Sequence, residues 1–257
     1  MTQALLAFYQ RIIIDRPWQA IAFVLAVTLL MGMGLPNFKL DASADSLTLE
    51  YDEDLNFFRE VSKRYGSDNF LIVTFSPKFG ELLDDQNLET LSSISKNLNN
   101  IKGVDSTLSL LDAPLLYSPK ITVGDLENPL NTVLSEGVDK QLAKQEFLTS
   151  PIYKDMLLSA DGKITGIIAK LSLDSQYLEL VSQRDNLRLI RDTEGLNSQQ
   201  QLVLASISQE FLDYRTAKAA EDHRRVAEVR NLMDQYRDQA TIYLGGPDMI
   251  TADMVDF

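Results

Sequence analysis

The stretch NFLIVTFS, residues 69–76, decides the fold, because its β-branched and aromatic residues predict a buried strand. Asp84 and Asp85 follow as caps of a helix that is predicted to run to about residue 100. The apolar face of that helix consists of Leu88, Leu91, Ile94 and Leu98. A second strand, VDSTLSLL, is predicted over residues 104–111. This part of the chain is therefore a strand–helix–strand unit.

The rest of the chain completes the predicted sheet. Two apolar runs within residues 156–172 flank Asp161-Gly162, and such a pair between apolar runs predicts a β-hairpin. Residues 174–239 are mostly helical in their spacing, and ATIYL, residues 240–244, predicts the last strand. Shorter helices are predicted over residues 55–65 and 132–147. The order β-α-β-β-α-β predicts an α+β domain of the ferredoxin-like type with a long helical insertion.

The composition excludes several classes of function. The 257 residues include 24 Lys and Arg against 37 Asp and Glu, so the net charge is −13. This acidity argues against nucleic-acid binding, because a phosphate backbone needs Lys and Arg to replace its counterions. The chain has no Cys, which excludes disulfides, a thiolate nucleophile and zinc–thiolate sites. Its single histidine, His223, excludes metal sites built from several histidines.

The N-terminal apolar run predicts a membrane anchor. The run WQAIAFVLAVTLLMGMGLP, residues 18–36, carries no charge and is long enough to predict a transmembrane helix. Arg11 and Arg16 precede the run and acidic residues predominate over 41–54, so the N-terminus is expected in the cytoplasm. Residues 1–17 predict a cytoplasmic or interfacial helix. A cleaved signal peptide and a buried core helix are the alternatives.

Candidate chemical sites each have a simpler structural interpretation. The acidic residues 52–54 lack the alternating ligands and the Gly of an EF-hand loop. His223 lies on a polar helix without an evident catalytic partner. The segment 245–248, Gly-Gly-Pro-Asp, does not match a phosphate-binding loop. We therefore expect no catalytic, cofactor-binding or metal-binding residues and no enzymatic activity.

One loop is a candidate for a substrate path. Leu115, Leu116 and Tyr117 lie between two prolines, which favours an exposed apolar contact in a loop. A second set of apolar residues is better interpreted as core, although it could line a path for an apolar substrate. That set consists of Phe57, Phe58, Phe70, Phe75, Phe79 and Met156.

Several stretches, taken in their order along the chain, resemble the RND superfamily of membrane exporters. They are the apolar run 18–36, KLDASADSL at 39–47, RYGSDNFLIVTFSP at 64–77, ADGKITGIIAKL at 160–171, and YLGGPDMITADMVDF at 243–257. Within that superfamily the resemblance is to the branch that includes MMPL-type and hopanoid-exporter-like proteins. The order of these stretches carries the resemblance, which covers nearly the whole chain.

The resemblance implies the N-terminal part of a proton-driven inner-membrane exporter of hydrophobic or amphipathic, lipid-like molecules. Residues 37–250 would form a periplasmic porter domain with its helical insertion at 174–239, and residues 251–257 would begin a second transmembrane helix. The implied partners are the inner membrane, the remaining transmembrane helices, a second porter domain and, as one option, further copies in a homo-oligomer.

The alternative is a self-standing, membrane-anchored periplasmic binding or scaffold protein that docks through its helical arm, residues 198–239. An anchored hydrolase is poorly supported, because the sequence shows no nucleophile–base pair.

Overall fold

A computed structural model describes residues 17–34, 53–65, 69–118, 120 and 130–255. The chain divides into two compact units, residues 1–46 and 47–257. The predicted helix over residues 1–17 lies almost wholly outside the described residues.

The first unit contains helix α2, Pro17–Gly32. Sixteen residues make a helix of about 24 Å, short of the hydrocarbon core of about 30 Å. None of its residues is buried. No helix in the described part of the chain is both long and apolar enough to cross a membrane. The predicted transmembrane helix over residues 18–36 is therefore wrong. The apolar run was counted as far as Pro36, whereas the helix ends at Gly32 and a turn follows.

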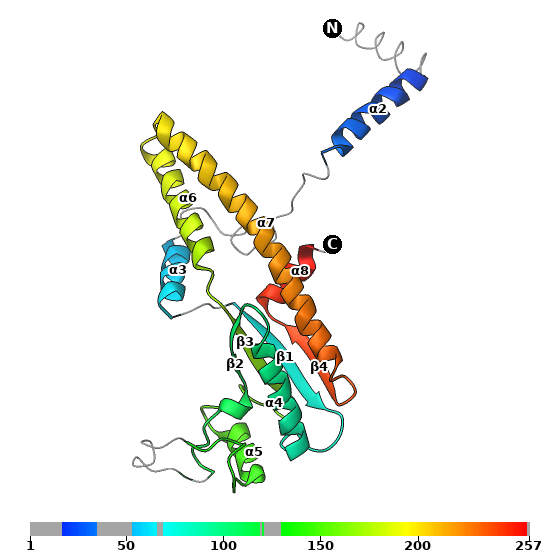
Figure 1. Ribbon diagram of the computed structural model, residues 1–257, viewed down its shortest axis with the longest axis vertical. Coiled ribbons are helices and arrows are strands. Elements are labelled where there is room, and N and C mark those ends of the chain that lie inside the picture. The colour runs from blue at the N-terminus through cyan, green and yellow to red at the C-terminus, as the bar shows by residue number, and fades with distance from the viewer. Residues whose placement is uncertain (1–16, 35–52, 66–68, 119, 121–129, 256–257) are drawn as a thin grey trace, which may run out of the picture. The chain divides into compact units, whose positions relative to one another are not determined.

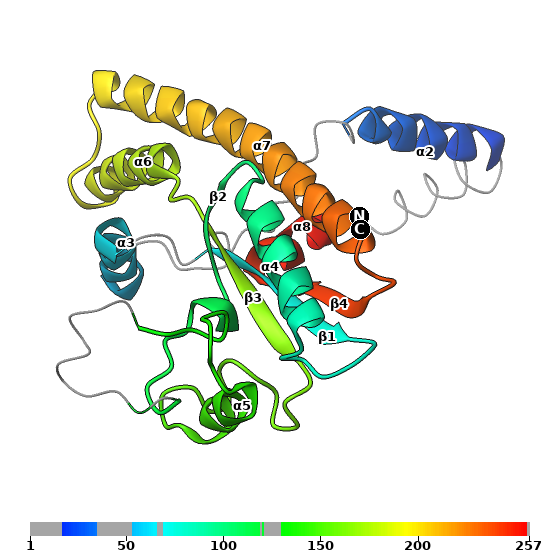
Figure 2. The same ribbon diagram turned by 60° about the horizontal axis from the view of Figure 1, so that its bottom comes forward.

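The second unit is built on a four-stranded sheet whose neighbouring strands are all antiparallel (Figures 1 and 2). Its strands are β1 Phe70–Pro77, β2 Val104–Leu108, β3 Thr165–Leu171 and β4 Ala240–Gly245, in the spatial order β2-β3-β1-β4. Helix α4, Asp85–Asn99, connects β1 to β2. Helices α6, Ser175–Thr193, and α7, Ser198–Asp234, connect β3 to β4. The fold class is α+β, and each of these two connections, through α4 and through α6 and α7, joins two strands that flank a third strand between them.

Shorter elements lie around the sheet and its two long helical connections. They are α3 Glu53–Tyr65, the 3₁₀ turn η4 Leu110–Asp112, α5 Lys140–Thr149 and α8 Pro247–Val255. Residues 251–255, predicted to begin a second transmembrane helix, lie in the nine-residue helix α8, and residues 256–257 lie outside the described part. Helix α8 packs on α7 and on the sheet, where Ala252 is buried.

The predicted hairpin around Asp161-Gly162 forms only as a tight turn closed by one antiparallel bridge, and residues 156–160 do not form a strand of the sheet. Strand β3 has both edges occupied, by β1 on one side and by β2 on the other. Residues 156–160 contribute only an isolated bridge between Leu158 and Thr165. The turn itself forms, with Gly162 at a φ of +66°. Alternation of apolar residues identifies a strand, but it does not identify the neighbour of that strand.

One core joins the sheet to α4 and to the C-terminal half of α7. The inward residues of β1 are Leu71, Val73 and Phe75, and all three are fully buried. The predicted apolar face of α4 is confirmed, because its four residues are all buried. The contribution of α7 consists of Val226, Val229, Leu232 and Met233. Each such burial stabilises the fold by about 1.5–3 kcal/mol.

Gly246→Ala should lower the free energy of unfolding by about 2 kcal/mol. Gly246 has a φ of +118°, and a Cβ there would lie 2.5 Å from the carbonyl oxygen of Phe70. Gly245→Ala is the matched control, because a Cβ at Gly245 meets no atom within 4 Å. Urea denaturation of both variants measures the difference, and equal losses would contradict the steric account.

Candidate functional site

Helix α7 has two halves with different surroundings. The C-terminal half belongs to the core of the sheet, whereas the N-terminal half pairs with α6. The helical arm predicted from the sequence covered residues 198–239, whereas from here on the helical arm means α6 together with residues 198–214 of α7 (Figure 1). Gly195, at a φ of +81°, turns the chain between the two helices, and Asn197 then caps α7 in a reciprocal box with Gln200. The residues of the turn itself therefore determine how the chain passes from α6 to α7 at the tip of the arm.

The arm has only a small apolar core of its own. Leu180, Val181 and Phe211 are buried, and the Phe211 ring lies 5.6 Å from the ring of Tyr177. The guanidinium of Arg184 lies 4.1 Å from the centroid of the Phe211 ring, a cation–π distance. All the buried residues of α6, and the first buried residue of α7, therefore lie in the half of the arm nearer the sheet.

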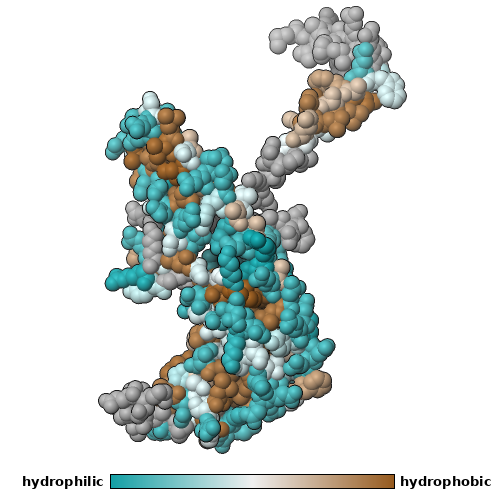
Figure 3. Space-filling view, viewed as in Figure 1, coloured by the Kyte–Doolittle hydropathy of each residue, from teal (hydrophilic) through white to brown (hydrophobic). Residues whose placement is uncertain are grey.

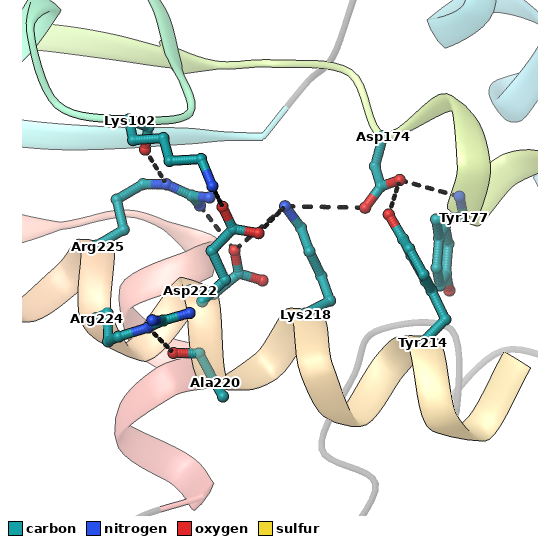
Figure 4. A network of polar contacts seen from close by, with 10 residues as sticks. Lys102, Asp174, Tyr177, Tyr214, Lys218, Ala220, Asp222, Arg224 and Arg225 are labelled. Carbon is teal, nitrogen blue, oxygen red and sulfur yellow. Dashed lines mark hydrogen bonds and ion pairs between the residues drawn. The ribbon is translucent and has the colours of Figure 1, made fainter.

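A cluster of charged residues and one tyrosine lies where the arm meets the sheet (Figure 4). We call it the base cluster, and it consists of Lys102, Asp174, Tyr214, Lys218, Glu221, Asp222 and Arg225. Arg225 is its buried member, with 5% of the residue exposed. Its Nε donates to the carbonyl oxygen of Lys102 at 3.1 Å, and its Nη1 donates to Asp222 at 2.7 Å. Arg225 thus ties α7 to the turn before β2.

Gly103 makes room for this guanidinium. It has a φ of +88°, and a Cβ there would lie 2.7–2.9 Å from the guanidinium atoms of Arg225. The glycine that ends the helix–strand connection therefore also permits the close approach of Arg225.

Asp174 connects the base cluster to the arm. Its carboxylate accepts from the backbone N–H of Tyr177 at 2.9 Å, which caps α6, and from the hydroxyl of Tyr214 at 2.6 Å. Burial, followed by the hydrogen bond to Asp174, raises the pKa of Tyr214 above its ordinary value. Tyr214 therefore stays a neutral donor, and it joins the start of α6 to α7.

Lys218 lies among three carboxylates. Its Nζ is 3.8 Å from Asp174, 3.8 Å from Glu221 and 3.7 Å from Asp222. A hydrogen bond from Lys102 and the charge of Lys218 lower the pKa of Glu221, which is ionised at neutral pH. The base cluster therefore joins charges of both signs from α7, from the turn before β2 and from the start of α6, at the point where the arm leaves the core.

The outer surface of the arm is apolar in part (Figure 3). Its exposed apolar side chains are Leu189, Leu202, Val203 and Leu212. An open cavity of about 320 Å³ lies along the start of α6, and its lining consists of Leu173, Ser175, Leu178, Glu179, Ser182 and Gln183. Two leucines beside hydroxyl, amide and carboxylate groups suit a molecule with an apolar part and a polar head.

The three residues predicted for a substrate path differ in their exposure to solvent. Leu115 is fully buried, Leu116 is half-buried, and Tyr117 is 58% exposed. The carboxylate of Glu146, itself buried, accepts from the backbone N–H groups of Leu116 and Tyr117 at 2.6 and 3.0 Å. The expectation that Leu115 is exposed is wrong, because this segment is held against α5. Contact of these residues with a substrate stays a prediction.

The other candidates do not form one site. Phe75 belongs to the core, whereas Phe57, Phe58, Phe79 and Met156 are exposed. Asp84 precedes α4, but its carboxylate accepts from the backbone N–H of Glu81 and not from the helix.

Of the acidic residues 52–54, Asp52 lies outside the described part of the chain. Within the described ranges, no three His, Cys, Asp or Glu residues are placed to hold a metal ion.

The chain matches no model of a protein family and no curated protein. The resemblance to the RND superfamily therefore stays a prediction drawn from the sequence.

Arg225→Met should lower the free energy of unfolding by about 3 kcal/mol, because it leaves Asp222 and the carbonyl of Lys102 without their buried donor. Arg224→Met is the matched control. Arg224 is exposed, and among the described residues its side chain bonds to the carbonyl of Ala220 in its own helix. Urea denaturation compares the two variants. A loss at Arg225 no larger than the loss at Arg224 would show that the base cluster does not hold the arm.

Proposed function

We propose that the chain is the N-terminal part of a proton-driven, RND-type inner-membrane exporter and that its second unit is a porter domain. The substrates would be hydrophobic or amphipathic, lipid-like molecules. The observation that carries the proposal is the α6–α7 connection, which extends from the antiparallel sheet and has an amphipathic cavity along α6. The order of the sequence stretches that resemble RND exporters supports the same proposal.

The cavity supports the choice of substrate class. Its volume of about 320 Å³ falls at the small end of ligand pockets, which suits one apolar chain rather than a large polar ligand. Leu173 and Leu178 would contact the apolar part of the substrate, and Glu179 with Gln183 would face its head group. The domain would guide such a molecule along the arm and would carry out no covalent chemistry.

The open face of the sheet supports a partner domain. Leu108, Ile168 and Ile72 are register partners across β2, β3 and β1, so their side chains form a row on one face. Leu108 is 48% and Ile168 36% exposed. A second porter domain of the same exporter would cover this row. We place the domain on the periplasmic side of a bacterial inner membrane, with the energy supplied by proton movement in parts of the exporter beyond the described residues.

A second candidate is a periplasmic binding or scaffold protein that docks through the helical arm. The observation that favours it is the exposure of apolar side chains on the first half of α7, where Leu202 is 73% and Leu212 51% exposed. Such a protein would use the arm to bind another protein, and the cavity on α6 would have no ligand.

Transport can be tested in cells that express the complete gene containing this chain. We expect these cells to accumulate less of a lipophilic dye, N-phenyl-1-naphthylamine, than cells with an empty vector. A protonophore should abolish the difference. Equal accumulation with and without the gene, at matched expression, would contradict the exporter.

Binding to the cavity separates the two candidates. The fluorescence of N-phenyl-1-naphthylamine should rise saturably when the chain is added, and Leu178→Asp should weaken this binding about fivefold or more. Leu202→Asp, which changes the arm outside the cavity, should leave dye binding unchanged. The scaffold candidate would instead be favoured by an absence of saturable binding in the wild-type chain.

A further inference from the structure

We propose that two copies of the chain pair through strand β4, antiparallel and in a register centred on Tyr243, so that their two sheets become one. The pairing would operate whether or not the domain serves in transport. The partner is a second copy of this chain, and the contact is made by backbone groups at the edge of the sheet.

Strand β4 lies at one edge of the sheet (Figure 2). Among the described residues, it has a neighbouring strand only on the side of β1. The backbone N–H of Lys78 donates to the carbonyl oxygen of Gln239 at 2.9 Å, and the N–H of Tyr243 also points toward β1, where it donates to a threonine hydroxyl at 3.2 Å. Because bonded and unbonded residues alternate along an antiparallel pair, Ile242 and Leu244 direct their N–H and C=O groups toward the free edge.

The two edges of the sheet differ in their protection. On β2, at the opposite edge, the register shifts between Val104 and Ser106, and the exposed, charged Asp105 lies at this irregularity. Charges and bulges at an edge prevent it from pairing with another strand. The sequence of β4, ATIYLG, contains neither a charge nor a proline. Of the two edges, β4 is therefore the one that can accept a further strand.

The side chain of Arg237 reaches the free edge without closing it. Its Nη1 donates to the carbonyl oxygen of Ile242 at 3.4 Å, a long contact, and its Nε donates to Asp234 at 2.5 Å. The side chain is 53% exposed. An incoming strand would replace the long contact with a backbone hydrogen bond, and Arg237 would keep its ion pair with Asp234.

A second copy of β4 matches this edge in a two-fold arrangement. With Tyr243 at the centre, Ile242 of each copy exchanges backbone hydrogen bonds with Leu244 of the other. Tyr243, which is 67% exposed in the single copy, then faces its own counterpart at an unbonded position, where side chains approach most closely. Thr241 faces Gly245 of the other copy. No like charges meet along the paired strands, so the edge is complementary to its own sequence.

Cysteine cross-linking of the full chain tests the register, because the chain has no native cysteine. Tyr243→Cys should give a disulfide-linked dimer under mild oxidation, since facing unbonded residues lie about 4.5 Å apart at Cα, within the range of a disulfide. Thr241→Cys is the matched control. Thr241 is also exposed, but its counterpart would lie about 13 Å along the partner strand, so this variant should not cross-link. Equal cross-linking of both variants, or cross-linking of neither, would overturn the proposal.

Sedimentation equilibrium of the full chain measures the association itself. The wild-type chain should show a monomer–dimer equilibrium, and Tyr243→Lys, which brings two positive charges face to face, should weaken it about tenfold or more. Leu108→Lys adds the same charge at the opposite edge and should leave the equilibrium unchanged.

Three results of the sedimentation experiment would overturn the proposal. The first is a chain that stays monomeric up to about 1 mM. The second is an equal loss of association in Leu108→Lys and Tyr243→Lys, which would assign the contact to the open face of the sheet. The third is association that responds to neither substitution, which would assign it to another surface, such as the exposed apolar side chains of α2.

Discussion

One buried guanidinium, that of Arg225, links helix α7 to the turn before β2 at the point where the surroundings of α7 change. A charged group removed from water must keep its hydrogen-bond partners, because the cost of leaving one unsatisfied exceeds the net stabilisation from most single contacts. Arg225 meets this requirement with the carbonyl oxygen of Lys102 and the carboxylate of Asp222, and Gly103 leaves the space that the side chain fills. Helix α7 is therefore fixed to the sheet at one defined turn.

This attachment divides helix α7 into two regions with different partners. On the C-terminal side of Arg225, α7 contributes apolar residues to the core and contacts α4 and α8. On the N-terminal side, α6 is the main partner of α7 within the described part of the chain, and their shared core centres on Phe211. Because α7 is one uninterrupted helix of 37 residues, the position of the arm is set at its base. Movement at the base cluster would therefore be transmitted along the whole arm.

The sequence predicted the elements whose signals are local. Residues 69–76 and 240–244 form strands, and the four apolar residues of α4 lie on its buried face, because alternation and helical spacing are properties of neighbouring residues. The end of the N-terminal helix was misplaced, because apolar composition continues past Gly32 although the helix does not. The partner of β3 was also wrong, because strand pairing depends on residues distant in the sequence.

Most contacts of the candidate site could not be predicted from the sequence. Arg225 belongs to a run of charged residues, which is usually a solvated face, and its partner carbonyl is 123 residues away. Glu146 lies in the helix predicted over residues 132–147, and helical spacing does not reveal that it is buried and accepts from the backbone of Leu116 and Tyr117. Spacing along one segment cannot reveal contacts of this kind.

The absence of native cysteine allows the central claim to be tested directly. Spin labels on cysteines at Glu194, at the tip of the arm, and at Asp105, on β2, would report the distance between arm and sheet by pulsed electron paramagnetic resonance. Both positions are exposed. If Arg225 fixes the arm, the chain should give one narrow distance distribution, and Arg225→Met should broaden it. A broad distribution in the wild-type chain, or one that Arg225→Met leaves unchanged, would contradict this account.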